Sequence, residues 1–208
     1  MSSLISKIKN LKKQDISLVI NKRTNEFYNF KRTNNKLFIE LSFCVLTANY
    51  NASKAIVIQN KIKSGFITFT FKELSSKLKE LGYRYPNLRA EYIIYNRQFL
   101  NKLKTVLNSY KEKNSLRDWF AENIKGLSYK ESSHFLRNIG YKDYAIIDFH
   151  IIDLLISYGY LKEKPKTLNR GKYIEIENIL SDIGKKAKLN QAELDLYLWY
   201  LETGTVLK

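Results

Sequence analysis

The sequence has very little cysteine and proline, with a single cysteine, Cys44, and two prolines among its 208 residues. One cysteine excludes an intramolecular disulfide, a four-cysteine iron–sulfur cluster and a cysteine-based zinc site. No apolar run approaches the roughly 18–20 residues that span a membrane. The N-terminal segment MSSLISKIKNLKKQD lacks the apolar core of a signal peptide. These absences predict a soluble, cytoplasmic protein with no membrane partner.

Acidic residues are scarce relative to basic ones, with 20 Asp and Glu against 36 Lys and Arg and a net charge of +16. This charge favours a polyanionic partner, nucleic acid above all, although a lysine-rich solvated surface gives the same sum. Two segments are rich in lysine, Lys7–Lys13 and the predicted loop Leu161–Lys172. Aromatic residues are plentiful, with 15 Tyr and 11 Phe, and 44% of the residues are apolar. The composition therefore predicts a folded core rather than disorder.

Hydrophobic periodicity is helical over most of the chain. Leu37–Thr47 is apolar nearly all round, which predicts a buried central helix, and spacings of three and four predict one long helix over Leu88–Tyr110. Only Ser17–Asn21 and Glu26–Lys31 look strand-like, and from them we expect at most a small hairpin. The further predicted helices are Ala52–Ile62, Phe71–Leu81, Ser115–Ile124, Tyr129–Asn138, Phe149–Tyr158, Glu175–Lys186 and Gln191–Glu202. The predicted fold class is all-α.

The segment 115–150 carries the most specific pattern of the chain. A predicted helix ends near Ile124, the residues KGLSY follow at Lys125–Tyr129, and a second helix starts near Lys130. Two helices joined by a tight turn with a glycine and an apolar residue make a helix-hairpin-helix motif. Such a turn exposes backbone N–H groups at the start of the second helix, where they suit a DNA phosphate.

Five motifs follow one another along the chain: LSFCVLTANYNASKA (41–55), RYPNLRAEYI (84–93), KGLSYKESSHFLRNIGY (125–141), AIIDFHI (145–151) and ETGTVLK (202–208). They resemble the motifs of the helix-hairpin-helix DNA glycosylases with a downstream aspartate, and most closely those of the archaeal-type 8-oxoguanine DNA glycosylase/AP lyases. They span most of the chain in the expected order. One departure is Ser128, which stands where the family commonly has a second glycine and so affects the shape of the turn.

The resemblance implies that Lys130 is the catalytic lysine and that Asp148 is its aspartate partner. A neutral amine can attack the sugar C1′ of a damaged nucleotide and form a Schiff base, after which β-elimination cleaves the strand. An aspartate can stabilise the positive charge that develops on the sugar, and Asp148 would also cap the helix that follows it. The alternatives are an ordinary surface lysine and a plain N-cap aspartate.

Recognition of the base requires that it be flipped out of the duplex into a pocket. The resemblance implies that Tyr85 and Trp199 stack on the flipped base and that Lys208 recognises 8-oxoguanine, which differs from guanine by an N–H donor at N7. Ordinary core packing is the alternative for both Tyr85 and Trp199, and a frayed chain end is the alternative for Lys208.

Further DNA contacts are expected at Lys125, Gly126 and Ser128 of the turn and at His134, for which a packed helix histidine is the alternative. The other histidine, His150, is far away in sequence, so we expect no metal site and no organic cofactor. Three arginines are expected either to contact the lesion or phosphates or to lie on a solvated helix face: Arg84, Arg89 and Arg97.

Together these observations predict two helical modules that flank an active-site cleft. Residues 35–145 would form the module with the hairpin, and residues 1–34 and 146–208 the second module. The expected function is removal of 8-oxoguanine from double-stranded DNA through a lysine Schiff base, with strand cleavage by β-elimination. The alternatives are a non-catalytic helix-hairpin-helix DNA-binding protein and a glycosylase for a different oxidised base. We expect a monomer associated with a prokaryotic nucleoid.

Overall fold

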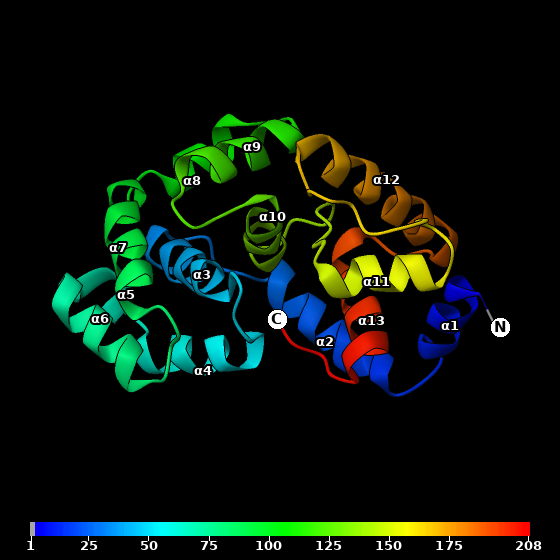
Figure 1. Ribbon diagram of the computed structural model, residues 1–208, viewed down its shortest axis with the longest axis horizontal. Helices are drawn as coiled ribbons and strands as arrows, with labels where there is room; N and C mark the ends of the chain where they lie inside the picture. Colours follow the sequence, from blue (N-terminus) through cyan, green and yellow to red (C-terminus); the bar gives the residue numbers. More distant parts are fainter. Residues whose placement is uncertain (1–2) are drawn as a thin grey trace. The chain divides into compact units, whose positions relative to one another are not determined.

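The computed structural model describes residues 3–208, and every regular element among them is a helix (Figure 1). This confirms the all-α prediction. None of the helices in these residues combines the length and the apolar character needed to cross a membrane.

The chain divides into two compact units. The hairpin unit comprises Lys31–Ile139, and the terminal unit comprises the residues up to Phe30 together with Gly140–Lys208. From the sequence, the hairpin unit was predicted to begin at residue 35 and end at residue 145.

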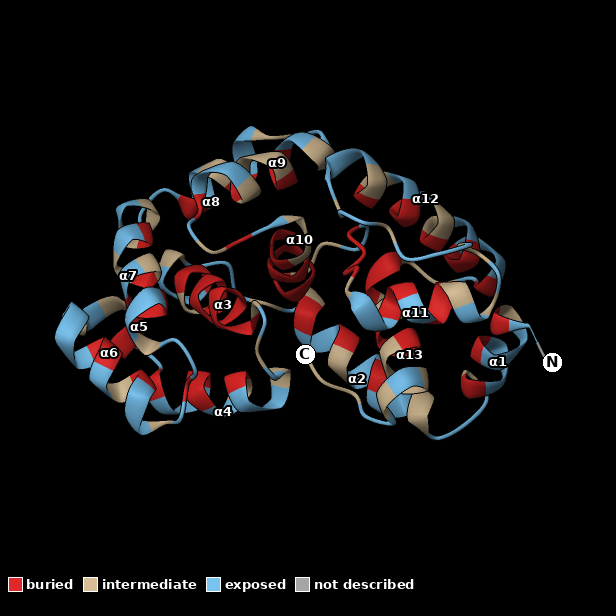
Figure 2. Cartoon of the chain, in the orientation of Figure 1, coloured by how far each residue is buried: buried red, intermediate tan, exposed pale blue. Residues whose placement is uncertain are grey.

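The hairpin unit is built around one helix that is buried on all sides. Its elements are α3 (Asn34–Thr47), α4 (Ala52–Ile62), α5 (Gly65–Thr68), α6 (Phe71–Glu80), α7 (Pro86–Asn96), the short 3-10 helix η1 (Arg97–Phe99), α8 (Leu103–Ser109), α9 (Lys113–Asn123) and α10 (Tyr129–Asn138). Helix α3 packs against α4, α5, α7, α8 and α10, and ten of its fourteen residues are buried (Figure 2). The predicted central helix is therefore confirmed.

A buried carboxylate joins three of these helices. Glu40 of α3 accepts hydrogen bonds from Asn138 Nδ2 of α10 at 2.6 Å and from Gln59 Nε2 of α4 at 3.0 Å. A buried charge is tolerated only where hydrogen bonds compensate for the lost water, so these contacts fix the positions of α4 and α10 on the central helix.

The prediction of one long helix over Leu88–Tyr110 is wrong, because the chain breaks there into α7, η1 and α8. The cause is Asn34, which is distant in sequence. Its side-chain amide donates to the carbonyl of Asn101 at 3.2 Å, and its oxygen accepts from the N–H of Lys104 at 3.1 Å. Asn34 therefore satisfies backbone groups that a continuous helix would have paired internally.

The terminal unit places its last helix at the centre. Its elements are α1 (Leu4–Leu11), α2 (Ile16–Tyr28), α11 (Phe149–Ser157), α12 (Arg170–Ala187) and α13 (Gln191–Thr203). Helix α13 packs against α1, α2, α11 and α12. Helix α1 contains most of the lysine-rich segment Lys7–Lys13 and was not predicted, and α12 begins within the segment that was predicted as a loop.

The two strand-like segments Ser17–Asn21 and Glu26–Lys31 are also corrected by the structure, because helix α2 covers all of the first and half of the second. The β-branched residues of the first segment favour a strand locally. However, the buried residues of α2 are Ile20, Thr24 and Phe27, which follow the helical spacing of four and three. Burial of this face against the rest of the unit outweighs the local preference.

This assignment predicts different costs for two neighbouring substitutions in α2. Ile20 is fully buried and Leu18 is 68% exposed. We expect Ile20→Ala to lower the free energy of unfolding by about 2–5 kcal/mol and Leu18→Ala to change it by less than about 0.5 kcal/mol, measured by urea denaturation. In a strand the two side chains would share one face, so equal losses would contradict the helix.

Candidate active site

The hairpin turn between α9 and α10 depends on a glycine that no other residue can replace without strain. Gly126 has φ +87°, a left-handed conformation that favours glycine. A Cβ atom at this position would lie 2.8 Å from Cδ2 of Tyr92 and 3.1 Å from Cγ1 of Val45. The turn is thus packed against α7 and α3, and the neighbouring Leu127, the apolar residue of the turn, is buried.

A buried asparagine holds the turn through its backbone. Asn96, at the end of α7, donates from Nδ2 to the carbonyl of Lys125 at 2.9 Å and accepts from the N–H of Lys125 at 3.0 Å. Both backbone groups of one residue are thereby fixed by one side chain. The ammonium of Lys125 lies over the ring of Tyr95, 4.0 Å from its centroid, and the Lys125 side chain is exposed on the turn.

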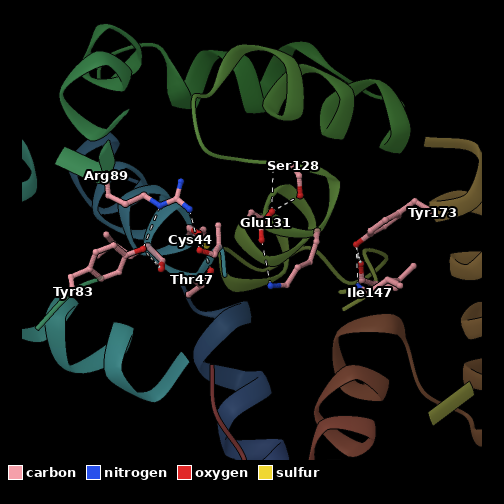
Figure 3. Close-up of polar contacts among 12 residues, drawn as sticks. Cys44, Thr47, Tyr83, Arg89, Ser128, Glu131, Ile147 and Tyr173 are labelled. Carbon is pink, nitrogen blue, oxygen red and sulfur yellow. Dashed lines mark hydrogen bonds and ion pairs between the residues drawn. The ribbon is translucent and has the colours of Figure 1, made fainter. Parts of the chain in front are cut away.

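The first turn of α10 contains Lys130 and a capping interaction. The carboxylate of Glu131 accepts from the backbone N–H of Ser128 at 3.2 Å and from the Ser128 hydroxyl (Figure 3). Lys130 Nζ lies 3.4 Å from Oε1 of the same carboxylate. The Lys130 side chain is 26% exposed, so the amine lies at the boundary between the protein and solvent.

Tyr129, the residue before Lys130, is fixed from α9. Its hydroxyl donates to Asp118 Oδ1, and the guanidinium of Arg117 lies 5.4 Å from the centroid of its ring. Arg117 is fully buried and donates to Asn114 at 2.8 Å and to Ser133 of α10 at 3.4 Å. The start of α10 is therefore held by the helix on the other side of the hairpin.

His134 lies one turn after Lys130, and it is only 6% exposed. Its ring packs edge-on against Phe43 of α3, with 5.6 Å between the centroids. This burial favours the packed helix histidine over a phosphate contact. In residues 3–208, no three His, Cys, Asp or Glu side chains lie close enough together to hold a metal ion.

Asp148 lies in the terminal unit and caps α11, as the sequence predicted. Its Oδ1 accepts from the N–H of Ile151 at 3.0 Å. The extended segment before it is held by α12: the Tyr173 hydroxyl donates to the carbonyl of Ala145 at 2.8 Å and accepts from the N–H of Ile147 at 3.2 Å (Figure 3). Glu177, one turn later, accepts from the N–H of Ala145 at 3.0 Å. These bonds fix the backbone that presents Asp148.

The expected base-stacking residues belong to different units. Tyr85 precedes α7 in the hairpin unit and is exposed, with the guanidinium of Arg84 at 4.9 Å from its ring centroid. Trp199 lies on α13 of the terminal unit and is half-buried, with its ring edge-on to His150 at 5.5 Å. Lys208 is half-buried in the segment that follows α13.

Two of the three arginines are bound to backbone carbonyls, Arg89 from a buried position and Arg97 from a half-buried one. Arg89 donates to Ala48 O at 3.1 Å and to the Tyr83 hydroxyl at 3.4 Å (Figure 3), and burial raises the pKa of that phenol. Arg97 donates to Phe66 O at 3.0 Å, and burial lowers the pKa of its guanidinium. Nothing in the sequence indicated that these two arginines would bond to backbone carbonyls.

With this geometry established, comparisons identify the family. A model of the 8-oxoguanine DNA glycosylase family (Ogg-HhH) matches residues 20–189. The 8-oxoguanine DNA glycosylase/AP lyase of Methanocaldococcus jannaschii is 52% identical over 206 residues, 99% of each chain. The enzyme of that name from Korarchaeum cryptofilum is 46% identical over 208 residues, 100% of this chain and 99% of the relative.

Solved structures agree with this match. The M. jannaschii glycosylase/lyase in complex with a 15mer DNA containing 8-oxoguanine has a TM-score of 0.95 at 50% identity and covers 99% of each chain. The 8-oxoguanine DNA glycosylase of Thermotoga maritima has a TM-score of 0.92 at 38% identity and covers 99% of this chain and 98% of that one. The chain belongs to the 8-oxoguanine DNA glycosylase family.

Three residues that shape the site of this glycosylase were not predicted from its sequence. Glu131 follows Ser128 by three positions, and this Ser-x-x-Glu spacing is the signature of a capping box that could have revealed it. Asn96 and Tyr173 gave no such signal, because each bonds to backbone more than 25 positions away.

The glycine at the hairpin provides a test of the turn. We expect Gly126→Ala to destabilise the hairpin unit by about 2–4 kcal/mol, because left-handed strain of about 1–2 kcal/mol adds to a clash with Tyr92 that cannot relax freely. Affinity for duplex DNA should fall as well, measured by fluorescence anisotropy. Gly82→Ala is the matched control: Gly82 also has a positive φ but has open space around its Cβ position, so only the left-handed strain of about 1–2 kcal/mol is expected. Equal costs at the two glycines would contradict the packed turn.

Tyr173 provides a second test, on the segment that presents Asp148. Tyr173→Phe removes a fully buried hydroxyl and leaves a buried N–H and a buried carbonyl without this partner. We expect a loss of about 1–3 kcal/mol in the free energy of unfolding and a slower reaction at the lesion. Tyr160→Phe makes the same chemical change at a half-buried tyrosine of the same unit, and should cost less than about 0.5 kcal/mol. Equal losses would show that the Tyr173 hydroxyl has no special role.

Proposed function

We propose that this protein removes 8-oxoguanine from double-stranded DNA and then cleaves the strand at the resulting abasic site. Support comes from family membership and from relatives named 8-oxoguanine DNA glycosylase/AP lyase. The observation that carries the chemistry is the position of Lys130, a partly exposed lysine in the first turn of the second hairpin helix.

Lys130 is the nucleophile in this proposal. Its neutral amine attacks C1′ of the damaged nucleotide while the N-glycosidic bond breaks, and the bonding electrons and a proton leave with the base. The nitrogen lone pair then forms the C=N bond as the C1′–O4′ bond breaks, and the second amine proton passes to O4′, which opens the sugar ring and gives a Schiff base between Lys130 and C1′. The Schiff base acidifies the neighbouring C2′ proton, and its removal expels the 3′ phosphate by β-elimination.

Asp148 stabilises the positive charge that develops on the sugar. Its Oδ1 is held by the N–H of Ile151, so the carboxylate does not have to be ordered during the reaction. A charge that is already oriented costs no reorganisation in the transition state.

Duplex DNA is bound without regard to sequence through the hairpin turn and the basic surface. Gly126 lets the backbone turn closely, and Lys125 is exposed beside it, as a phosphate contact requires. With a net charge of +16, we expect affinity to fall steeply as the salt concentration rises. Ser128, which is exposed at the start of α10, contributes a further contact.

The flipped base is held by Tyr85 and Trp199, with Lys208 as the residue that distinguishes 8-oxoguanine. In support, the indole Nε1 of Trp199 is buried and has no hydrogen-bond partner among the described residues, as is expected of a side chain with a role beyond core packing. We further propose that the protein acts as a monomer at the nucleoid of a prokaryotic cell.

Borohydride trapping tests the chemistry directly. The protein is incubated with an 8-oxoguanine duplex and a reductant, which converts the Schiff base into a stable covalent adduct. We expect an adduct with the unmodified protein and a loss of at least about 1000-fold in trapping for Lys130→Gln, with duplex affinity retained. Absence of an adduct under binding conditions would favour a non-catalytic DNA-binding protein. A panel of duplexes with oxidised pyrimidines identifies a different lesion if one is trapped faster.

A further inference from the structure

Glu131 uses its two carboxylate oxygens for two different tasks. Oε2 accepts from the N–H and the hydroxyl of Ser128 and so caps α10, whereas Oε1 lies 3.4 Å from Nζ of Lys130. The Glu131 side chain is only 7% exposed. The carboxylate is therefore rigid, and one of its oxygens faces the amine of the proposed nucleophile.

The contact with Lys130 is unusual for neighbours in a helix. Successive residues point about 100° apart around the helix axis, so adjacent side chains do not normally meet. Lys130 therefore bends toward Glu131 near the N-terminal end of α10. This end carries the positive pole of the helix dipole, which repels an ammonium. Glu131 supplies the attraction that holds the ammonium there in the resting enzyme, before the proton loss that attack requires.

The chain contains its own comparison at the start of α6. Thr70, Phe71, Lys72 and Glu73 repeat the order of hydroxyl, aromatic, lysine and glutamate found at 128–131. Glu73 caps α6 in the same way, accepting from the Thr70 N–H at 2.7 Å and from its hydroxyl at 2.9 Å.

The lysine behaves differently in the two places. Lys72 and Glu73 are both exposed, and no ion pair joins them in the part of the chain that the structure describes. At α10 the glutamate is buried and the lysine lies against it. The cap alone therefore does not draw a lysine inward, and the contact at 130–131 is a particular feature of the hairpin.

We propose that Glu131 is a positioning residue that holds the Lys130 amine beside the first turn of α10, in place for attack. The inference rests on the proposed function, in which Lys130 is the nucleophile. A lysine side chain has about 2 kcal/mol of rotamer entropy, and a displaced reacting atom can cost about 100-fold in rate. One oxygen of the buried Glu131 carboxylate is hydrogen-bonded to the backbone of Ser128, so the carboxylate cannot move freely. Its other oxygen can therefore orient the Lys130 amine.

The test is Glu131→Gln, with Glu73→Gln as the matched control. The glutamine oxygen can still accept from the Ser128 N–H, so the cap is kept while the attraction to Lys130 is lost. We expect the single-turnover rate of borohydride trapping to fall about 10- to 100-fold. The dissociation constant for a duplex with a tetrahydrofuran abasic analogue, which forms no Schiff base, should stay within about twofold, and Tm should change no more than in Glu73→Gln, whose trapping rate should be unaltered.

Several results would overturn the inference. A parent-like trapping rate in Glu131→Gln would do so, as would a slower rate that came with a matching loss of duplex affinity or of Tm, since that pattern indicates a purely structural role. If Glu131→Gln does not fold, Glu131→Asp replaces it: the charge is kept but the shorter side chain cannot serve both partners, so a slower rate at unchanged affinity is expected and a parent-like rate overturns the inference.

Failure of the proposed function has a different signature. The unmodified protein would then form no adduct, or Lys130→Gln would still form one. Failure of the Glu131 inference alone leaves the adduct dependent on Lys130 and independent of Glu131.

Discussion

The burial of helix α10 is the constraint on which the hairpin unit depends. The helix is buried from Glu131 to Asn138, and only its first two residues reach the boundary with solvent. Its polar groups are tied to neighbouring helices, with Asn138 bonded to Glu40 of α3 and Ser133 to Arg117 of α9. A helix held in this way cannot tilt without disturbing a close-packed interior, so its first turn is a fixed platform for Lys130.

The two proposed catalytic residues are positioned in the same way, each at the N-terminal end of a helix. Lys130 lies in the first turn of α10, and Asp148 is the N-cap of α11. In each case the preceding backbone is held by a buried side chain, Asn96 for the hairpin turn and Tyr173 for the segment before Asp148. The N-terminal ends of helices attract anions through their free N–H groups, which suits a reaction on a phosphate-rich strand. The rigid backbone on either side of Lys130 thus fixes the position from which its flexible side chain extends.

Much of this arrangement could be predicted from local patterns. Helix α10 and its hairpin followed from the KGLSY turn and the periodicity after it, and the cap at Asp148 followed from its position before an apolar run. The predictions that were wrong depended on distant partners. Ile20 and its neighbours resemble a strand over five residues, and only burial with Thr24 and Phe27 reveals the helix. The break after α7 requires Asn34, some 67 positions from its partner Asn101, which no local window contains.

The site residues also divide into those that local sequence predicts and those that depend on distant partners. Lys130 and Asp148 were indicated by motif, whereas the residues that hold them were not, since an asparagine or tyrosine that bonds to remote backbone has no sequence signature. Glu131 is the exception, because its spacing from Ser128 predicts a cap. Its second contact, with Lys130, became visible only in the structure. The comparable sequence at Thr70–Glu73 shows that burial, rather than the pattern itself, distinguishes the two places.

The central claim is that one lysine, fixed at the start of α10, performs the chemistry. Peptide mapping of the borohydride-trapped adduct by mass spectrometry tests it most directly, since the cross-linked residue is read without any substitution. The account predicts that the sugar remnant is attached to Nζ of Lys130. Attachment to any other lysine, or to the N-terminal amine, would contradict it.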